Sequence, residues 1–488
     1  MQKFISKYAL AAHLALMTVA PLVLYPFFAE ELVVTGMLWL SLFGATWLVM
    51  EPSRRANEML HDARRRVISE IARDPLFWFL VFLLVFVGFR AFNDGIAMGY
   101  NAETSYWFIS EPIVKILPGV VKGCGHMPFA TLLVATIVIM GCRHALGRGA
   151  RIAFFFSAST IAGISGLVLV AFLALGAEQL ETLGMLGLLD MAGCPQAEAS
   201  YLGLGYCLNF IFGLLALVGS CNLRWRKSVP LFLFSLGGTS SAAIFFGPQQ
   251  TLLVFGALAL ITAVLIVVFA CRCLSMAGAF KCVMMLLMTI LIPVLMVLWV
   301  VKDDMLVRRM SVLRGEGLFP KDYVESRQAV SALTKRVWLT HRWLGTGVGS
   351  FELQLRFNAS AKDWKAISPG LRQAQNGWWQ LLLERGILGV SFAAILLGFL
   401  LWTWISRMIS ACRSGFASDG TPGFFGATDP ICWILPFILS AVAVDALYSS
   451  SFLRPEVVLA VVSAFALAAS SFPLPKKTGG AVVEDNES

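Results

Sequence analysis

Cationic side chains recur at helical spacing between residues 325 and 344. Arg327, Ser331, Lys335 and Arg342 fall on one face of the expected amphipathic helix, while apolar residues such as Val330 fall on another. An arginine guanidinium is permanently charged and can donate two hydrogen bonds to a phosphate at once. The stripe therefore predicts a site for an anionic substrate.

Three alternate glycines follow this helix directly, in the stretch LTHRWLGTGVGSFE: Gly345, Gly347 and Gly349. Gly345 suits the left-handed residue that ends many helices, and the run lets successive backbone N–H groups turn inward toward an oxyanion. It is not a Walker phosphate loop, which ends in Gly-Lys-Ser/Thr, and no strand precedes it as in a dinucleotide fingerprint. A plain tight turn between two helices is the alternative.

The elements that must position these residues are transmembrane helices. Mean hydropathy is +0.77 and only 14% of the residues are charged, which excludes an ordinary soluble globular protein. Apolar runs of about 18 residues or more are long enough to cross a bilayer. We predict an all-α, polytopic membrane protein with about 12 transmembrane helices, at 9–28, 32–50, 76–92, 128–142, 153–176, 201–220, 230–247, 251–270, 283–301, 386–404, 431–448 and 456–472.

Lysine and arginine set the expected orientation, because they are retained in the short cytoplasmic loops. They cluster after the second span and at every second loop thereafter, so both termini are expected on the cytoplasmic side. The predicted organisation is transmembrane helices 1–9 over 1–301, an external substrate-binding loop over 302–385, helices 10–12 over 386–472 and a cytoplasmic polar tail over 473–488.

The external loop is unusually basic. From residue 302 to about 375 it holds thirteen Lys and Arg residues against seven Asp and Glu. Long loops escape the positive-inside rule, so this charge does not contradict the topology. It indicates either a site for an anionic substrate or a solvated basic surface against anionic lipid headgroups.

A second segment, QNGWWQLLLERGILGV over 375–390, opens with two amides and places two tryptophans at interfacial depth before the tenth span. Together with SRQAVSALTKRVWLTHRWLGTGVGSF, it resembles the O-antigen ligase and O-antigen polymerase superfamily. Arg327 stands eighteen residues before Gly345, as the family arginine stands before its G-x-G-x-G-x-F turn. Asn376 and Glu384 fall where the family's second motif has its counterparts, and the match covers about 65 residues.

The resemblance implies a glycosyltransferase working on the outer (periplasmic) side of the bacterial inner membrane. It would transfer a glycan from an undecaprenyl-pyrophosphate carrier to an acceptor glycan or to lipid A-core, surrounded by membrane lipids. No metal, other cofactor or nucleic acid is implied, because the pyrophosphate is itself the leaving group. Arg327 would be catalytic, neutralising the charge that builds on the phosphates. The expected substrate-binding residues are Lys335, Arg336, Arg342, Gly345, Gly347, Gly349, Asn376, Glu384 and, from its depth at the outer end of the third span, Arg90.

Two positions depart from the family pattern. Gln375 stands at the catalytic position of the family histidine, taken as the base for the acceptor hydroxyl, and an amide cannot accept that proton. Ser241 stands where a second family arginine is expected. Because an imidazole titrates near neutral pH, His341 is the first candidate for a substitute base, and Arg90 for a substitute phosphate contact.

These departures leave other hypotheses open. A catalytically silent homologue that binds carrier lipid would keep the architecture without the chemistry. A transporter of lipid-linked glycans would favour repeated halves with charged groups at mid-membrane, whereas the charge here lies at the outer face.

The sequence also predicts a disulfide between Cys124 and Cys194, the two cysteines that fall in external loops.

Overall fold

A computed structural model gives the structure of the chain over residues 2–470. Within that range it does not describe 53–58, 94–95, 97, 102–105, 110–119, 122–123, 147, 176–198, 223–228, 247–248, 274–275, 301–320, 361–362, 364–373, 375, 416–430 and 451–452. The predicted polar tail and the first part of the predicted external loop therefore lie outside the described residues.

The described chain is almost entirely helical, as predicted. Its α-helices are α1 (Gln2–Leu24), α2 (Glu30–Met50), α3 (Leu60–Arg73), α4 (Pro75–Ala91), α5 (His126–Met140), α6 (Arg148–Leu175), α9 (Ala199–Asn222), α10 (Val229–Phe246), α11 (Gln249–Cys273), α12 (Met276–Val300), α14 (Lys321–Thr340), α15 (Phe351–Asn358), α17 (Gly377–Gly415), α19 (Ile431–Asp445) and α20 (Pro455–Ser470). A π-helix, η1 (Gly141–Ala145), continues α5.

One small element that is not helical was not predicted. Strands β1 (Met98–Asn101) and β2 (Tyr106–Ile109) pair antiparallel, with Met98 opposite Ile109 and Asn101 opposite Tyr106. The hairpin lies in the second of the predicted external loops, where no apolar run signals a span. Short alternating strands of this length carry little hydrophobic pattern, so the sequence predicted only a loop.

The chain is a helical membrane protein. A helix covers most of each predicted span, and in the described residues five helices are long and apolar enough to cross a membrane. They are Glu30–Met50, His126–Ala145, Ala150–Ala171, Thr251–Cys271 and Gly377–Ser410, and the bent pair formed by α3 and α4 would be a sixth. The remaining apolar helices are shorter in their described parts, so the total number of spans stays a prediction.

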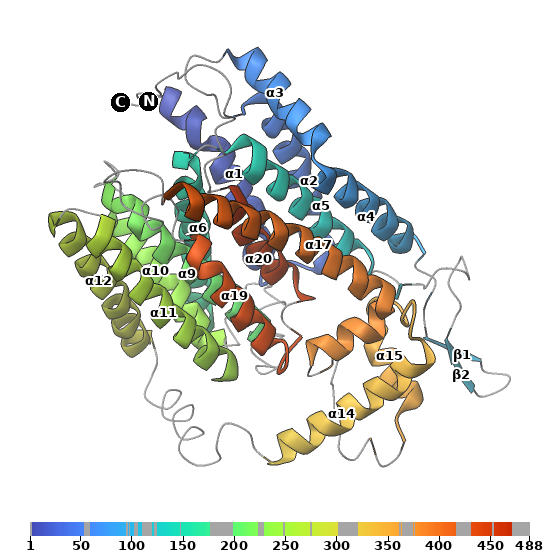
Figure 1. Cartoon of the computed structure of the whole chain (residues 1–488). Coiled ribbons are helices and arrows are strands. Elements are labelled where there is room, and N and C mark those ends of the chain that lie inside the picture. The colour runs from blue at the N-terminus through green and yellow to red at the C-terminus, as the bar shows by residue number, and fades with distance from the viewer. Residues whose placement is uncertain are drawn as a thin grey trace.

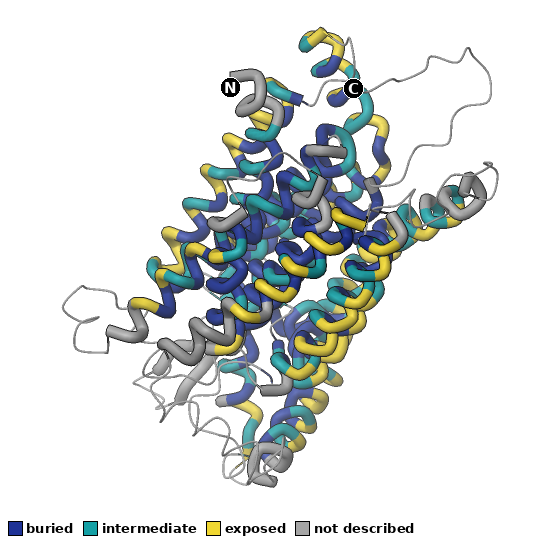
Figure 2. The backbone as a smooth tube through the Cα atoms, turned by 90° about the vertical axis from the view of Figure 1, so that its left-hand side faces the viewer, coloured by how far each residue is buried: buried dark blue, intermediate teal, exposed yellow. Residues whose placement is uncertain are grey.

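The core of the bundle is formed by apolar side chains from its central helices, while exposed residues run along the outer helices (Figure 2). At the crossing of α6 and α10, a methyl group at Gly163 would overlap the backbone of Ser235, and one at Gly238 would overlap the carbonyl of Gly163. Small residues let helix backbones approach this closely, which is the usual packing device of membrane helices.

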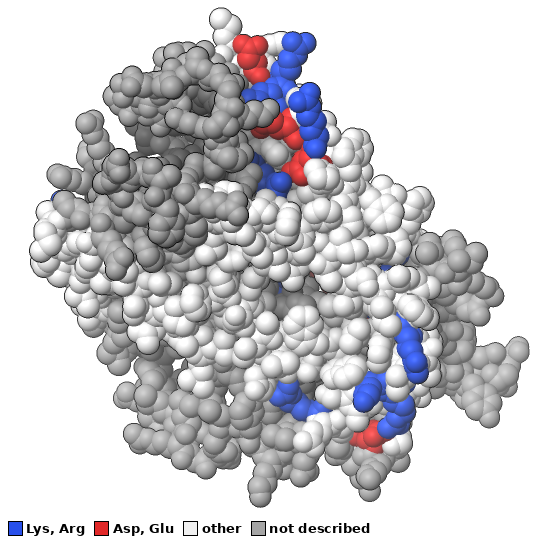
Figure 3. Space-filling model, in the orientation of Figure 1, with Lys and Arg blue, Asp and Glu red and all other residues white. Residues whose placement is uncertain are grey.

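The segments that carry the predicted site gather at one end of the bundle. Figure 1 places α14, α15 and the hairpin together there, with α3 at the opposite end. Charged side chains on the face shown in Figure 3 gather at two ends, with a broad uncharged band between them. This is the distribution expected when a lipid bilayer surrounds the middle of a protein.

Asp74 fixes a sharp bend between α3 and α4, whose axes differ by 69°. One carboxylate oxygen caps α4 by accepting a 3.0 Å hydrogen bond from the backbone N–H of Leu76. The other accepts from Arg143 and from His144 on η1, each at 2.9 Å. Asp74 therefore ties the bend to a third element.

This network predicts a pH-dependent stability. Burial raises the pKa of Asp74, but the hydrogen bond from His144, the charge of Arg143 and the Leu76 N–H outweigh it and hold the pKa below its usual range. The carboxylate therefore stabilises the fold above its unfolded pKa, near 3.9, and this stabilisation is lost as the pH falls through the folded value. Melting temperatures measured in detergent should fall more steeply with acid for wild type than for Asp74→Asn. Parallel curves would contradict this role.

Candidate functional site

Helix α14 forms the amphipathic helix that the sequence predicted. Its buried residues Val330, Leu333 and Val337 pack in a small separate core with Phe351 of α15 and Leu383 of α17. The helix ends at Thr340, a few residues before the predicted end, and a turn connects it to Gly345. This core holds the outer segments together as a unit distinct from the main bundle.

Arg327 and Asn376, from the two halves of the family motif, meet at the same atom. The guanidinium of Arg327 donates to the backbone carbonyl of Leu447, and the Asn376 amide donates to that carbonyl at 3.4 Å. The guanidinium also lies over the ring of Tyr448, 4.9 Å from its centroid. The connection between α19 and α20 therefore forms the third side of the site, and no sequence motif had indicated it.

Asn376 is positioned by the start of α17. Its side-chain oxygen caps that helix, accepting from the N–H groups of Trp378 at 3.1 Å and Trp379 at 3.2 Å. The backbone N–H of Gly377, the first residue of α17, donates to the carbonyls of Ala446 and Ser449, both at 2.9 Å. The helix start and the α19–α20 connection are thus fastened to each other, which fixes the amide beside Arg327.

A buried carboxylate, that of Asp445, ends α19 directly before this connection. Asp445 accepts hydrogen bonds from the hydroxyls of Thr251, at 2.5 Å, and Ser449, at 2.6 Å. Nearby in the same connection, Arg454 donates to the hydroxyl of Tyr25 at 3.1 Å and lies over that ring.

The rest of the predicted cationic stripe lies far from Arg327. Lys335 is eight residues further along α14 and so about 12 Å away along the axis, at 1.5 Å of rise per residue. Arg342 and His341 follow the end of the helix, about 20 Å from Arg327 by the same measure. Lys335, Arg336, His341 and Arg342 are all exposed. Lys335 and Arg336 are therefore about two turns of helix away from Arg327, and His341 and Arg342 do not lie beside it.

His341 contacts its neighbour rather than Arg327 or Asn376. Its Nδ1 lies 2.8 Å from the hydroxyl of Thr340. The structure therefore does not bring the proposed substitute base to the Arg327 site. Gln375, at the position of the family histidine, lies outside the described residues.

The three glycines adopt the left-handed backbone that their type predicted, with φ of 72° at Gly345, 102° at Gly347 and 76° at Gly349. Their N–H groups are used within the protein. Gly345 donates to the carbonyl of His341 at 3.0 Å and Gly347 to that of Glu384 at 3.1 Å, while Gly349 donates to the Glu384 carboxylate. The oxyanion held by this turn is therefore the side chain of Glu384.

Glu384 is the centre of a second, buried charged cluster. Its carboxylate also accepts from Gln380 at 3.2 Å, and the guanidinium groups of Arg385 and Arg90 lie within electrostatic reach. Arg90 is only 7% exposed and lies over the Phe86 ring. In the described part of the chain, its Nε and Nη2 have no hydrogen-bond partner. The cluster thus holds two cations and one carboxylate, and this excess of positive charge makes it a candidate binding site for an anionic group.

Replacing the Glu384 carboxylate with an amide tests this cluster. Glu384→Gln keeps an acceptor for the Gly349 N–H but removes the charge that compensates Arg90 and Arg385, and uncompensated buried charge destabilises proteins. We expect a loss of about 2 kcal/mol, measured as a lower melting temperature in detergent. Glu352→Gln, on α15 and outside this cluster, is the matched control. Equal stability of the two variants would contradict the compensating role of Glu384.

The remaining sequence candidates are placed as follows. Ser241 is buried inside α10, and its hydroxyl has no hydrogen-bond partner among the described residues. Cys124 is a free thiol beside the turn, and Cys194, its predicted disulfide partner, lies outside the described residues. Within the described segments, no group of three His, Cys, Asp or Glu residues could hold a metal ion.

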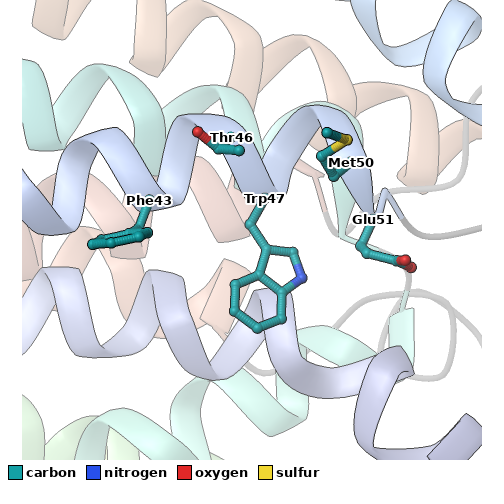
Figure 4. Close-up of a pocket in the computed structure, with 5 residues that line it drawn as sticks. All are labelled: Phe43, Thr46, Trp47, Met50 and Glu51. Atoms are coloured by element: carbon teal, nitrogen blue, oxygen red, sulfur yellow. The ribbon is translucent and has the colours of Figure 1, made fainter.

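A shallow hollow of about 170 Å³ lies elsewhere, along the last turns of α2 (Figure 4). It is lined by Phe43, Thr46, Trp47, Met50 and Glu51. Three of these, Phe43, Trp47 and Met50, are large exposed apolar residues, as on a lipid-facing surface. It contains none of the residues discussed above and is not part of the candidate site.

Comparison with known proteins leaves the family open. No protein-family model matches the chain, and no curated protein sequence matches it either.

Proposed function

We propose that this protein is a membrane glycosyltransferase of the O-antigen ligase and polymerase type. It transfers a glycan from an undecaprenyl-pyrophosphate carrier to an acceptor glycan or to lipid A-core, on the outer side of the bacterial inner membrane. The observation that supports this most directly is the convergence of Arg327 and Asn376 on the Leu447 carbonyl. Two residues that the family motif links only by sequence thus donate to one carbonyl oxygen.

The chemistry needs a cation where Arg327 lies. As the acceptor hydroxyl attacks the anomeric carbon, the bond from that carbon to the carrier oxygen breaks and its electron pair stays on the pyrophosphate. The proton of the attacking hydroxyl passes to water or to the departing pyrophosphate. A fixed guanidinium stabilises this developing charge without reorganising, and charge-assisted hydrogen bonds to phosphate are strong. The Tyr448 ring and the Leu447 carbonyl hold the guanidinium in place before substrate arrives.

The proposal also specifies on which side of the membrane the candidate site lies. With both termini cytoplasmic, twelve spans place α14, α15 and the start of α17 in the periplasm. A cysteine introduced at exposed Ser360 should react with a membrane-impermeant maleimide in spheroplasts, in a background where the native cysteines are replaced. A cysteine at His61 on α3 should react only after lysis. The reverse pattern would overturn the orientation.

A catalytically silent homologue is the second candidate, and the burial of Ser241 favours it. The second family arginine is expected at this position, where the structure has a small hydroxyl enclosed in α10. Arg90, at the outer end of α4, is the nearest replacement for that cation, but it lies with Glu384 and not with Arg327. No observation comparably favours the transporter hypothesis.

Deleting the gene in its own host tests the function directly. Loss of the ladder of surface glycolipids on a gel, restored by wild type but not by Arg327→Ala, is the expected result. An unchanged ladder in the deletion strain, or full restoration by Arg327→Ala, would favour the silent homologue. Complementation by Gln375→His with a stronger ladder than wild type would show that the family base was the limiting group.

A further inference from the structure

The exposed cations beyond Arg327 need an explanation of their own. Lys335 lies about two turns along α14 from Arg327, and Arg342 lies beyond the end of the helix. Two large apolar side chains alternate with them at the same end of the helix: Leu339 is 41% exposed and Trp343 is 68% exposed. A soluble surface has little reason to expose an aliphatic and an indole side chain together between cations.

This surface is continuous with the lipid-facing side of α17. The Ile387 N–H donates to the carbonyl of Arg342 at 2.9 Å, and the Leu388 N–H donates to the carbonyl of Trp343 at 3.1 Å. Leu388 is itself 41% exposed. It begins the apolar face that continues along α17 to Trp402, which is 71% exposed in a helix long enough to span a membrane.

The composition of the surface fits the boundary of a bilayer. Tryptophan is enriched at membrane–water interfaces, where its ring is apolar and its N–H remains hydrated. Lysine and arginine stems extend from such a level so that their charges reach the phosphates of the headgroups. Arg342 is fixed in this region, because its Nε donates to the Leu339 carbonyl at 3.1 Å.

We infer that the last turn of α14 and the turn after it form a docking surface for phospholipids of the outer leaflet. Leu339, Trp343 and Leu388 enter the level of the upper acyl chains, and Lys335 and Arg342 bind the headgroup phosphates. The surface anchors the outer unit of α14 and α15 to the bilayer beside the candidate site. It would do so whether or not the protein transfers glycans.

Photocrosslinking in the full chain tests this surface. Benzoylphenylalanine replaces Trp343, and the protein is placed in nanodiscs of fluorescent phosphatidylglycerol or phosphatidylcholine. Trp402 is the lipid-facing reference position for the same replacement, and exposed Gln328, near the other end of α14, is the control. The expected result is a lipid adduct at position 343 close to that at 402 and well above that at 328.

The cations are tested in the same preparation. Lys335→Gln with Arg342→Gln should lower the adduct with phosphatidylglycerol relative to phosphatidylcholine by about thirtyfold, because each of the two surface cations contributes about 1 kcal/mol toward anionic lipid. Arg65→Gln on α3, at the other end of the bundle, should leave that ratio unchanged. Equal adducts at 343 and 328, or a ratio unaffected by the double substitution, would overturn the inference.

Discussion

Arg327→Ala is expected to lower glycan transfer by about 100- to 1,000-fold, the loss typical of removing one fixed donor from a developing oxyanion. The guanidinium is held by the Leu447 carbonyl and the Tyr448 ring, so it needs no reorganisation when the pyrophosphate departs. Arg327→Lys should recover only part of the loss, because an ammonium lacks the planar pair of donors. The measurement is the rate of transfer by purified protein from a lipid-linked glycan to its acceptor.

Two substitutions on the same helix separate this local role from the general charge of α14. Lys335→Ala and Arg336→Ala each remove one exposed cation about 12 Å or more from Arg327, so transfer should stay within about threefold of wild type. Equal losses in all three variants would mean that the loop acts only through its overall field. Melting temperatures of the variants must match, so that a lower rate reflects chemistry rather than unfolding.

The comparison between the stripe and the site shows what periodicity can predict. Apolar and cationic residues at a period of 3.6 predicted the helix and its buried face, because both depend only on local spacing. The same period cannot place residues along the axis relative to a partner from another segment. Arg327 and Arg342 therefore share a predicted stripe, while the structure separates them by most of the length of α14.

A sequence motif also cannot indicate a hydrogen-bond partner that is a backbone atom. The atom that Arg327 and Asn376 share is the carbonyl of Leu447, which any residue would supply, in a connection 120 residues from Arg327. Likewise, the left-handed glycines could be predicted from residue type, but not that the N–H groups of Gly347 and Gly349 would donate to Glu384. Both arrangements depend on tertiary contacts between separate segments of the chain.

Gly345→Ala and Gly386→Ala are expected to destabilise the outer unit by about 2 to 5 kcal/mol each, from a strained backbone and an overpacked contact. Both residues have positive φ, 72° and 64°. A methyl group at Gly345 would lie 2.6 Å from the backbone nitrogen of Gly386, and one at Gly386 would lie 2.5 Å from the nitrogen of Gly345. Neither backbone can move without separating the turn from α17, so the melting temperature in detergent should fall clearly.

A third glycine on the same helix provides the control for this prediction. Gly398 lies within α17, and a methyl group there would meet no atom within 4 Å. Gly398→Ala should therefore leave stability unchanged or raise it by up to about 1 kcal/mol, through the higher helix propensity of alanine. If Gly345→Ala behaves like Gly398→Ala, the turn does not pack on the break at Gly386, and the two motif segments are not held in the arrangement described. If only the two positive-φ glycines are intolerant, the turn is the joint that fixes α14 over the start of α17, and Arg327 depends on it for its place beside Asn376.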